Sequence, residues 1–199
     1  IIGKWVLTGS ERMKQRPIRV LVEALNRLGA RIGYLENEGF PPLEIYGSRL
    51  VGGSIDIPAS VSSQYISALL MIAPYMEKGL EIRLTGKVVS SSYIDMTLQI
   101  MREFGAEVGR EDTVIGVKPG EYRSVPYRVE SDWSAASYFY ELLAIAGEGE
   151  IILTGLKEKS MQGDSRQTVV WRKLGVRTCY EGDLVRLSAA KPEIDLLDY

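Results

Sequence analysis

The sequence has no histidine and only one cysteine, Cys179, among its 199 residues. Without histidine there is no Ser-His-Asp triad, and a lone cysteine neither closes an internal disulfide nor supplies the ligand set of a zinc cluster. These absences exclude many hydrolases and leave no plausible zinc site.

Long hydrophobic runs are also missing. The longest, 68–75 and 142–146, are far shorter than the roughly 20 apolar residues that span a bilayer, and no charged-then-apolar signal segment opens the chain. We therefore predict a cytoplasmic protein without membrane association. The chain begins without methionine and stops at Tyr199 without a terminating pattern, so we expect a piece of a longer protein.

Charges of both signs are balanced, with a formal net charge of −2 and 25% charged residues beside 45% hydrophobic residues. This is the composition of a soluble globular protein, and the slightly acidic balance argues against nucleic acid as a partner. Arg12, Lys14, Arg16 and Arg19 nevertheless lie within one segment of eight residues. A local cluster of this kind predicts a small anionic ligand.

A tripeptide, Leu-Thr-Gly, occurs at residues 7–9, 84–86 and 153–155, each time at the end of an apolar, strand-like run. About 20 residues after each copy, a glycine in the position of a helix C-cap ends a helical pattern of apolar residues; these glycines are Gly29, Gly105 and Gly175. Two short strands around a turn follow in each copy. The tripeptide, its distance to the glycine and the order of the predicted elements agree in all three copies, which favours a true repeat over chance similarity.

Two copies also contain a helix before the tripeptide strand, at 62–74 and 134–146. The unit is therefore helix, strand, helix, strand, strand, with a period of about 70 to 77 residues. This period is too long for the common solenoids and predicts an α/β (α+β) fold of compact units repeated around an axis. The stretch 119–126, with two prolines at its end and start, is a candidate boundary. We assign residues 1–130 to two repeated units of one domain and residues 131–199 to the first, truncated unit of a second domain.

Serine clusters open helices at equivalent places in successive repeats, at residues 62–63 and 90–92. A helix N-terminus with free N–H groups and hydroxyls is a suitable seat for phosphate or carboxylate, and it is equally consistent with ordinary N-caps. Gln64 adds an amide able to orient a ligand, and Tyr93 adds a ring with a polar tip. Their alternatives are a solvated glutamine and a half-buried core tyrosine.

Arg16 precedes Pro17, which is well placed to open a helix. Because the helix dipole disfavours a cation at that end unless an anion binds nearby, and a guanidinium can bind carboxylate or phosphate through two hydrogen bonds, Arg16 is a candidate anion ligand. A solvated run of charges is the alternative. Asp132 and the segment 160–164 are better interpreted as caps of the helices that follow them.

Five segments, in the same order and spacing, resemble the 3-phosphoshikimate 1-carboxyvinyltransferase family along nearly the whole chain; they are 12–17, 60–65, 92–97, 129–139 and 160–164. The Ser-Ser-Gln and Ser-Met-Gln-Gly-Asp segments are the most specific of these. The resemblance implies the enolpyruvyl transferase fold, in which each of two domains holds three βαβαββ-type units around a pseudo-threefold axis. This chain would hold parts of both domains.

The resemblance implies transfer of the enolpyruvyl group of phosphoenolpyruvate to the 5-hydroxyl of shikimate 3-phosphate, a step toward chorismate and the aromatic amino acids. It implies no metal and no organic cofactor, and we expect a monomer. By position, the contacts to shikimate 3-phosphate would be Ser62, Ser63, Gln64, Ser90 and Tyr93. Arg16 would contact phosphoenolpyruvate, and Gln64 would reach it as well.

The same resemblance places the acid/base aspartate and glutamate of the family after Tyr199, and its N-terminal Lys-Ser segment before Ile1. Since the reaction needs carboxyl groups to move protons, we expect the catalytic residues to lie outside this chain and the chain alone to be inactive. One alternative is the related UDP-N-acetylglucosamine enolpyruvyl transferase, although Cys179 lies in a predicted strand rather than in a reactive glycine-rich loop. Another is a catalytically dead binding or structural module of the same fold.

Overall fold

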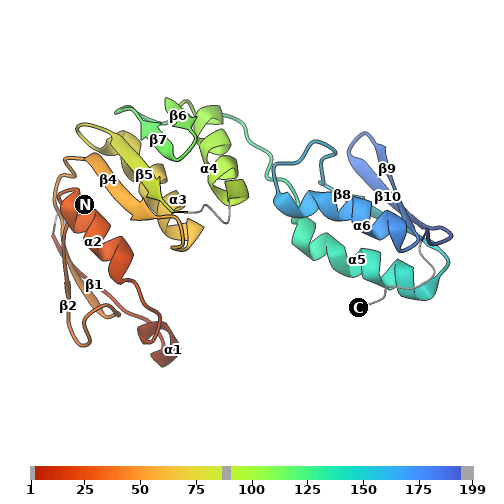
Figure 1. Cartoon of the computed structure of the whole chain (residues 1–199), viewed down its shortest axis with the longest axis horizontal. Coiled ribbons are helices and arrows are strands. Elements are labelled where there is room, and N and C mark those ends of the chain that lie inside the picture. Colours follow the sequence, from red (N-terminus) through yellow and green to blue (C-terminus); the bar gives the residue numbers. More distant parts are fainter. Residues whose placement is uncertain (1–2, 87–90, 194–199) are drawn as a thin grey trace. The chain divides into compact units, whose positions relative to one another are not determined.

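The computed structural model describes residues 3–86 and 91–193. The chain divides into two compact units, Ile1–Val125 and Pro126–Tyr199 (Figure 1). Each unit has its own hydrophobic core. Three small sheets and the helices that cover them make up the described structure.

The first unit begins with a three-stranded antiparallel sheet. Its strands are β1 (Lys4–Leu7), β2 (Arg31–Tyr34) and β3 (Leu43–Tyr46), in the order β1-β3-β2. Between β1 and β2 lie a short helix, α1 (Glu11–Lys14), and the amphipathic helix α2 (Arg19–Arg27). Helix α2 buries Val22 and Ala24, and Leu28 follows it as a fully buried C-cap residue.

A four-stranded sheet completes the first unit, in the order β4-β5-β7-β6. Strand β4 (Gly53–Pro58) runs parallel to β5 (Leu80–Thr85), and helix α3 (Ser63–Ile72) with a 3-10 turn, η1 (Ala73–Tyr75), connects them. Helix α4 (Ser91–Glu103) then leads to the antiparallel hairpin of β6 (Val108–Glu111) and β7 (Val114–Val117). The result is one complete βαβαββ unit.

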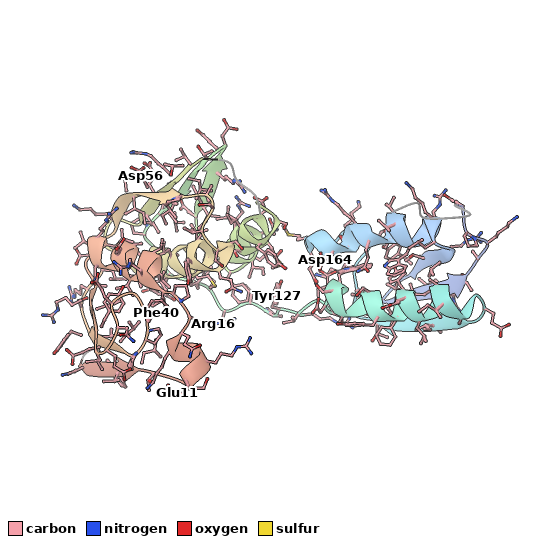
Figure 2. The ribbon with its side chains drawn as sticks, turned by 60° about the horizontal axis from the view of Figure 1, so that its bottom comes forward. Glu11, Arg16, Phe40, Asp56, Tyr127 and Asp164 are labelled. Carbon is pink, nitrogen blue, oxygen red and sulfur yellow. The ribbon has the colours of Figure 1, made fainter. Side chains whose placement is uncertain are left out.

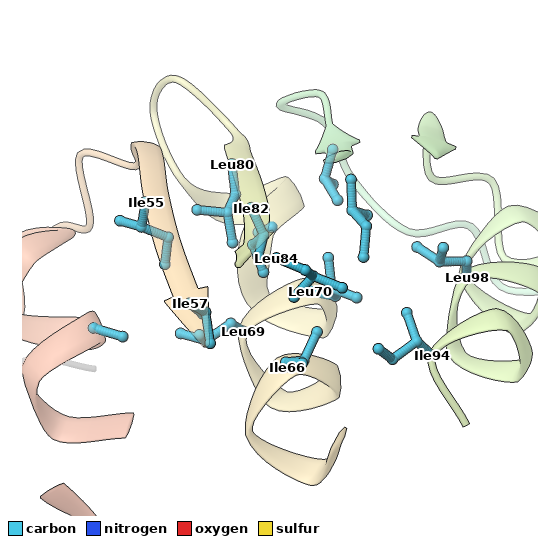
Figure 3. Packing of buried hydrophobic residues seen from close by; sticks show 14 of the residues in the cluster. Ile55, Ile57, Ile66, Leu69, Leu70, Leu80, Ile82, Leu84, Ile94 and Leu98 are labelled. Carbon is cyan, nitrogen blue, oxygen red and sulfur yellow. The ribbon is translucent and has the colours of Figure 1, made fainter. Parts of the chain in front are cut away.

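Alternating apolar residues of the parallel strands form the core of the first unit. Ile55 and Ile57 of β4 pack with Leu69 of α3, and Ile82 of β5 is fully buried beside them (Figure 3). Polar residues of β5, such as Arg83, alternate to the other face of the sheet, as expected for a strand that is buried on one side. The helices therefore cover one face of this sheet.

The second unit contains α5 (Trp133–Ala146), β8 (Glu150–Thr154), the 3-10 turn η2 (Gly163–Arg166), α6 (Gln167–Lys173), β9 (Val176–Glu181) and β10 (Leu184–Ala189). Its antiparallel sheet has the order β8-β10-β9. Trp133 and Tyr140 of α5 are fully buried and dominate its core.

The predicted repeat is confirmed, because three segments share the order strand, helix, strand, strand. In each, the third strand lies between the first and second, as in β1-β3-β2, β5-β7-β6 and β8-β10-β9. The three predicted C-cap glycines all have positive φ, at +105° for Gly29 and +88° for both Gly105 and Gly175. Glycine tolerates this conformation without the strain that a side chain would introduce, so the spacing of these glycines reflects backbone geometry.

Two local predictions differ from the structure. Strand β4 was not among the strands predicted from the residues, because it begins with Gly53, after Gly52, and ends with Pro58, and such residues indicate turns. Helix α2 begins at Arg19 with Ile18 as its N-cap, not at Pro17, so Arg16 lies further from the helix start than predicted. The helix dipole therefore bears less directly on Arg16 than the sequence suggested.

The hydroxyl of Tyr140 makes the second unit sensitive to alkaline pH. The hydroxyl lies 2.8 Å from that of Thr178, the ring stacks on Trp171, and burial raises the pKa of Tyr140 to about 12. In the unfolded chain the phenol ionises near pH 10, so its contribution to stability is complete below pH 10 and is lost as the pH rises towards 12.

We expect the free energy of unfolding of the second unit to fall across this range, because the unfolded chain loses the Tyr140 proton before the folded chain does. Tyr140→Phe should be less stable at pH 8 but should lose less stability between pH 10 and 12. Urea unfolding at several pH values measures both slopes, and equal slopes for the two proteins would contradict the assignment.

Candidate functional site

Helices α3 and α4 begin at the same edge of the four-stranded sheet. Because β4 and β5 are parallel, the helices that follow them both start beyond the carboxyl ends of these strands. The hydroxyls of Ser67 and Thr97 lie 2.8 Å apart and connect the two helices near these starts. The first turns of α3 and α4, which carry most of the candidate residues, therefore lie side by side.

The N-terminus of α3 exposes polar groups. Ser62 is the N-cap, and its hydroxyl oxygen accepts a hydrogen bond from the backbone N–H of Gln64 at 3.3 Å. Ser62 and Gln64 are exposed and Ser63 is half-buried. No described residue hydrogen-bonds to the side-chain amide of Gln64. The capping role predicted as an alternative for Ser62 is thus real, and it leaves the hydroxyl hydrogen available.

The first turn of α4 carries Tyr93, whose side chain is 57% exposed. The backbone carbonyl of Tyr93 accepts a hydrogen bond from Thr97 at 2.8 Å, and Thr97 is also the residue that contacts Ser67 of α3. This chain of hydroxyls fixes the start of α4 against α3. Ser90, the remaining candidate of this cluster, lies outside the described residues.

Arg16 lies between α1 and α2, next to the start of α3 (Figure 2). The hydroxyl of Tyr65, in the first turn of α3, donates a hydrogen bond of 2.5 Å to the carbonyl of Pro17. The structure therefore brings the segment that carries Arg16 to the helix that carries Ser62 and Gln64, although 48 residues separate Tyr65 from Pro17.

Two basic residues close to Arg16 in the sequence, Lys14 and Arg19, are paired with glutamates. Lys14 pairs with Glu11 at 3.3 Å and Glu36 at 3.5 Å, and its hydrogen bond to Glu11 is the main cause of its raised pKa. Arg19 pairs with Glu38 at 2.9 Å. Arg16 is exposed, and within the described ranges no carboxylate pairs with it. Its guanidinium is therefore free to bind an anion.

Asp132 caps the helix that follows it, as the sequence predicted, whereas segment 160–164 does not, because neither η2 nor α6 has a side-chain cap. Asp132 is the N-cap of α5, and its carboxylate accepts a hydrogen bond from Ser134 N–H at 2.7 Å. Gln162 accepts from the N–H of Trp133 at 2.9 Å and donates to the carbonyl of Ser131 at 2.9 Å. These contacts join the starts of α5 and η2 and leave the side chains satisfied within the protein.

Sequence reasoning missed the role of Glu130. Its carboxylate accepts hydrogen bonds from the Trp133 indole at 2.9 Å, from Lys157 N–H at 3.0 Å and from Ser160 at 3.0 Å. A signal was present, since an acidic residue three positions before a tryptophan at a helix start is a natural partner for the indole N–H. Glu130 therefore anchors the loops of the second unit.

Among residues 3–86 and 91–193, no group of histidine, cysteine and carboxylate side chains is arranged to hold a metal ion. In the same ranges no helix is both long and apolar enough to cross a membrane.

The fold places the chain in a structural class. An EPSP synthase from Acinetobacter baumannii superposes with a TM-score of 0.72 over 96% of this chain and 44% of that one, at 21% identity. The chain therefore has the enolpyruvyl transferase fold.

The family follows from the sequence comparisons. The family model of EPSP synthase (3-phosphoshikimate 1-carboxyvinyltransferase) matches residues 2–196, and the chain belongs to this family. A 3-phosphoshikimate 1-carboxyvinyltransferase of Bacteroides fragilis is 51% identical over 197 residues, covering 98% of this chain and 48% of the relative. Relatives of the same name from Sulfurovum sp. and Escherichia coli are 43% and 44% identical. The chain spans about half the length of these relatives, and the matches do not favour a UDP-N-acetylglucosamine enolpyruvyl transferase.

Proposed function

We propose that this chain is part of an enzyme that transfers the enolpyruvyl group of phosphoenolpyruvate to the 5-hydroxyl of shikimate 3-phosphate. The observation that carries the proposal is the shared edge of the four-stranded sheet, where α3 and α4 begin and where Tyr65 holds the segment of the unpaired Arg16. The names of the relatives, all 3-phosphoshikimate 1-carboxyvinyltransferases, support the same reaction.

The groups at this edge suit anionic, hydroxylated ligands. The N-terminus of α3 offers backbone N–H groups and a positive dipole end, to which Ser62, Ser63 and Gln64 add hydroxyls and an amide. We assign these three residues, with Ser90 and Tyr93, to shikimate 3-phosphate, and Gln64 also to phosphoenolpyruvate. We assign Arg16 to phosphoenolpyruvate, because a guanidinium binds carboxylate and phosphate through two parallel hydrogen bonds. No metal and no organic cofactor enter this proposal.

In this proposal the residues of this chain bind the substrates but do not carry out the proton transfers. The proton transfers need carboxyl groups that we assign to parts of the whole enzyme beyond these residues. We also propose that residues 1–130 and 131–199 belong to different domains of that enzyme, which the division after Val125 supports. A cytoplasmic location and a monomeric state remain predictions from the sequence.

Binding of shikimate 3-phosphate tests the proposal directly. We expect a dissociation constant of order 1 mM, because a few hydrogen bonds to phosphate are offset by the lost freedom of the ligand. Amide shifts in the 199-residue chain should cluster around Ser62, Gln64 and Tyr93, and shikimate should shift them less than its 3-phosphate.

Two variants sharpen this test. Gln64→Ala should weaken binding by at least about 10-fold, since a hydrogen bond to a charged group contributes about 1.5–3 kcal/mol. Ser62→Gly removes the hydroxyl and largely keeps the cap, because glycine is nearly as good an N-cap as serine, and it should also weaken binding. Equal responses to shikimate and its 3-phosphate, or wild-type affinity in both variants, would rule out the proposed contacts.

A further inference from the structure

The segment around Arg16 is held from two sides. On one side the hydroxyl of Tyr65 donates to the carbonyl of Pro17 at 2.5 Å. On the other, the N–H of Ile18 donates to the carbonyl of Gly39, in the loop between β2 and β3, at 2.8 Å. The backbone next to Arg16 is therefore fixed between the start of α3 and this loop.

Tyr65 is the residue that couples this segment to α3. Residues 15–18 belong to no helix or strand, and within the described part of the chain the Tyr65 hydroxyl makes the only hydrogen bond between them and α3. Tyr65 directly follows Gln64 and is half-buried. This bond therefore ties the segment of Arg16 directly to the first turn of α3.

We propose that Tyr65 is a positioning residue, which holds the guanidinium of Arg16 at a fixed place beside the α3 N-terminus so that two anionic ligands bind next to each other. This inference rests on the proposed function, in which Arg16 binds phosphoenolpyruvate and the start of α3 binds shikimate 3-phosphate, with Gln64 reaching phosphoenolpyruvate as well. The contact between Ser67 and Thr97 does the same for Tyr93, because Thr97 bonds to both Ser67 and the carbonyl of Tyr93. Helix α3 is thus the element to which both other binding segments are attached.

Tyr122 provides a matched control. Its hydroxyl donates a hydrogen bond of 2.9 Å to the carbonyl of Met71, near the opposite end of α3. Tyr65→Phe and Tyr122→Phe each remove one tyrosine hydroxyl that binds a backbone carbonyl in the same unit. General loss of stability should therefore be similar in the two variants, whereas only Tyr65→Phe releases the segment of Arg16.

The experiment is a pair of titrations of the 199-residue chain, with shikimate 3-phosphate alone and then with phosphoenolpyruvate at saturating shikimate 3-phosphate. The Nε–H signal of Arg16 and the amides of the α3 N-terminus report the two ligands separately. We expect Tyr65→Phe to weaken the binding of phosphoenolpyruvate about 5- to 10-fold and the binding of shikimate 3-phosphate less than about 2-fold. The segment that carries Arg16 keeps its charge in this variant, but it must be ordered when phosphoenolpyruvate binds. Tyr122→Phe should leave both affinities within about 2-fold of wild type.

Equal affinities for phosphoenolpyruvate in the two variants would overturn the positioning role. If phosphoenolpyruvate does not shift the Arg16 signal of the wild type while shikimate 3-phosphate shifts the amides of α3, the inference is wrong. The proposed binding of shikimate 3-phosphate then still stands. If the wild type responds to neither ligand, the proposed function itself is wrong. Thermal unfolding of both variants, measured in parallel, identifies any difference that comes from stability alone.

Discussion

Trp133→Ala is expected to unfold the second unit and to leave the first unit folded. Trp133 is fully buried at the start of α5 and lies in a small cluster with Tyr140, Leu143 and Val185. Replacing a buried tryptophan with alanine costs about 3–5 kcal/mol, and the substitution also removes the indole partner of the Glu130 carboxylate. Since a whole domain is stable by only about 5–15 kcal/mol, and small ones by less, this loss is comparable to the stability of the unit.

The two units can be observed separately in an amide correlation spectrum. For Trp133→Ala, signals of the second unit should collapse to the narrow range of an unfolded chain, while those of the first keep their positions. Trp5→Ala is the matched control, because Trp5 lies on β1 and is 53% exposed, so it should cost far less. A spectrum in which both units collapse together would show that the two cores are not independent.

The repeated part of the fold was predictable because each copy of the repeat has recognisable residues at the end of its first strand and at the end of its helix. A strand ends at Leu-Thr-Gly, and about 20 residues later a helix ends at a glycine with positive φ. Such positions are restricted by backbone geometry, so Gly29, Gly105 and Gly175 indicate helix ends whatever surrounds them. The hairpins follow for the same reason, since short alternating strands flank each turn.

Long-range contacts were not predictable. Nothing near Tyr65 in the sequence indicates that its hydroxyl reaches Pro17, and nothing near Arg16 indicates that Glu36 and Glu38 neutralise its neighbours. These partners meet only after the sheets have formed. The candidate residues could therefore be chosen by type and position, whereas the availability of Arg16 became visible only in three dimensions.

Gly52→Ala is expected to disrupt the first unit at the point where the parallel strands begin. Gly52 has φ of +76°, and a Cβ there would lie 2.0 Å from the carbonyl oxygen of Gly79 and 2.9 Å from the Cβ of Met76. The same carbonyl accepts the hydrogen bond from Gly53 N–H at 3.0 Å that starts the pairing of β4 with β5. Real Cβ atoms do not approach a carbonyl oxygen this closely, so the two strands must separate at this end.

The size of the effect follows from comparison with Gly86→Ala. Gly86 lies in the same unit with φ of +88°, and a Cβ there would meet no atom of the described residues within 4 Å. Alanine should therefore cost only the strain of a left-handed residue, about 1–2 kcal/mol. Gly52→Ala has this strain and also a collision with the backbone oxygen of Gly79. A backbone atom cannot move aside as the end of a flexible side chain can. We expect its total cost to exceed about 4 kcal/mol, in the range reserved for severe packing defects.

Denaturant unfolding of the two variants measures this difference. Gly86→Ala should keep a cooperative transition of the first unit at a modestly lower midpoint, whereas Gly52→Ala should abolish that transition or move it close to zero denaturant. The amide shifts caused by shikimate 3-phosphate should disappear with it, because β4 and β5 carry α3 and α4 at their carboxyl ends. Equal midpoints for the two variants would mean that the start of β5 yields to a side chain at Gly52, and that the close approach of Gly52 to Gly79 does not hold the parallel pair together.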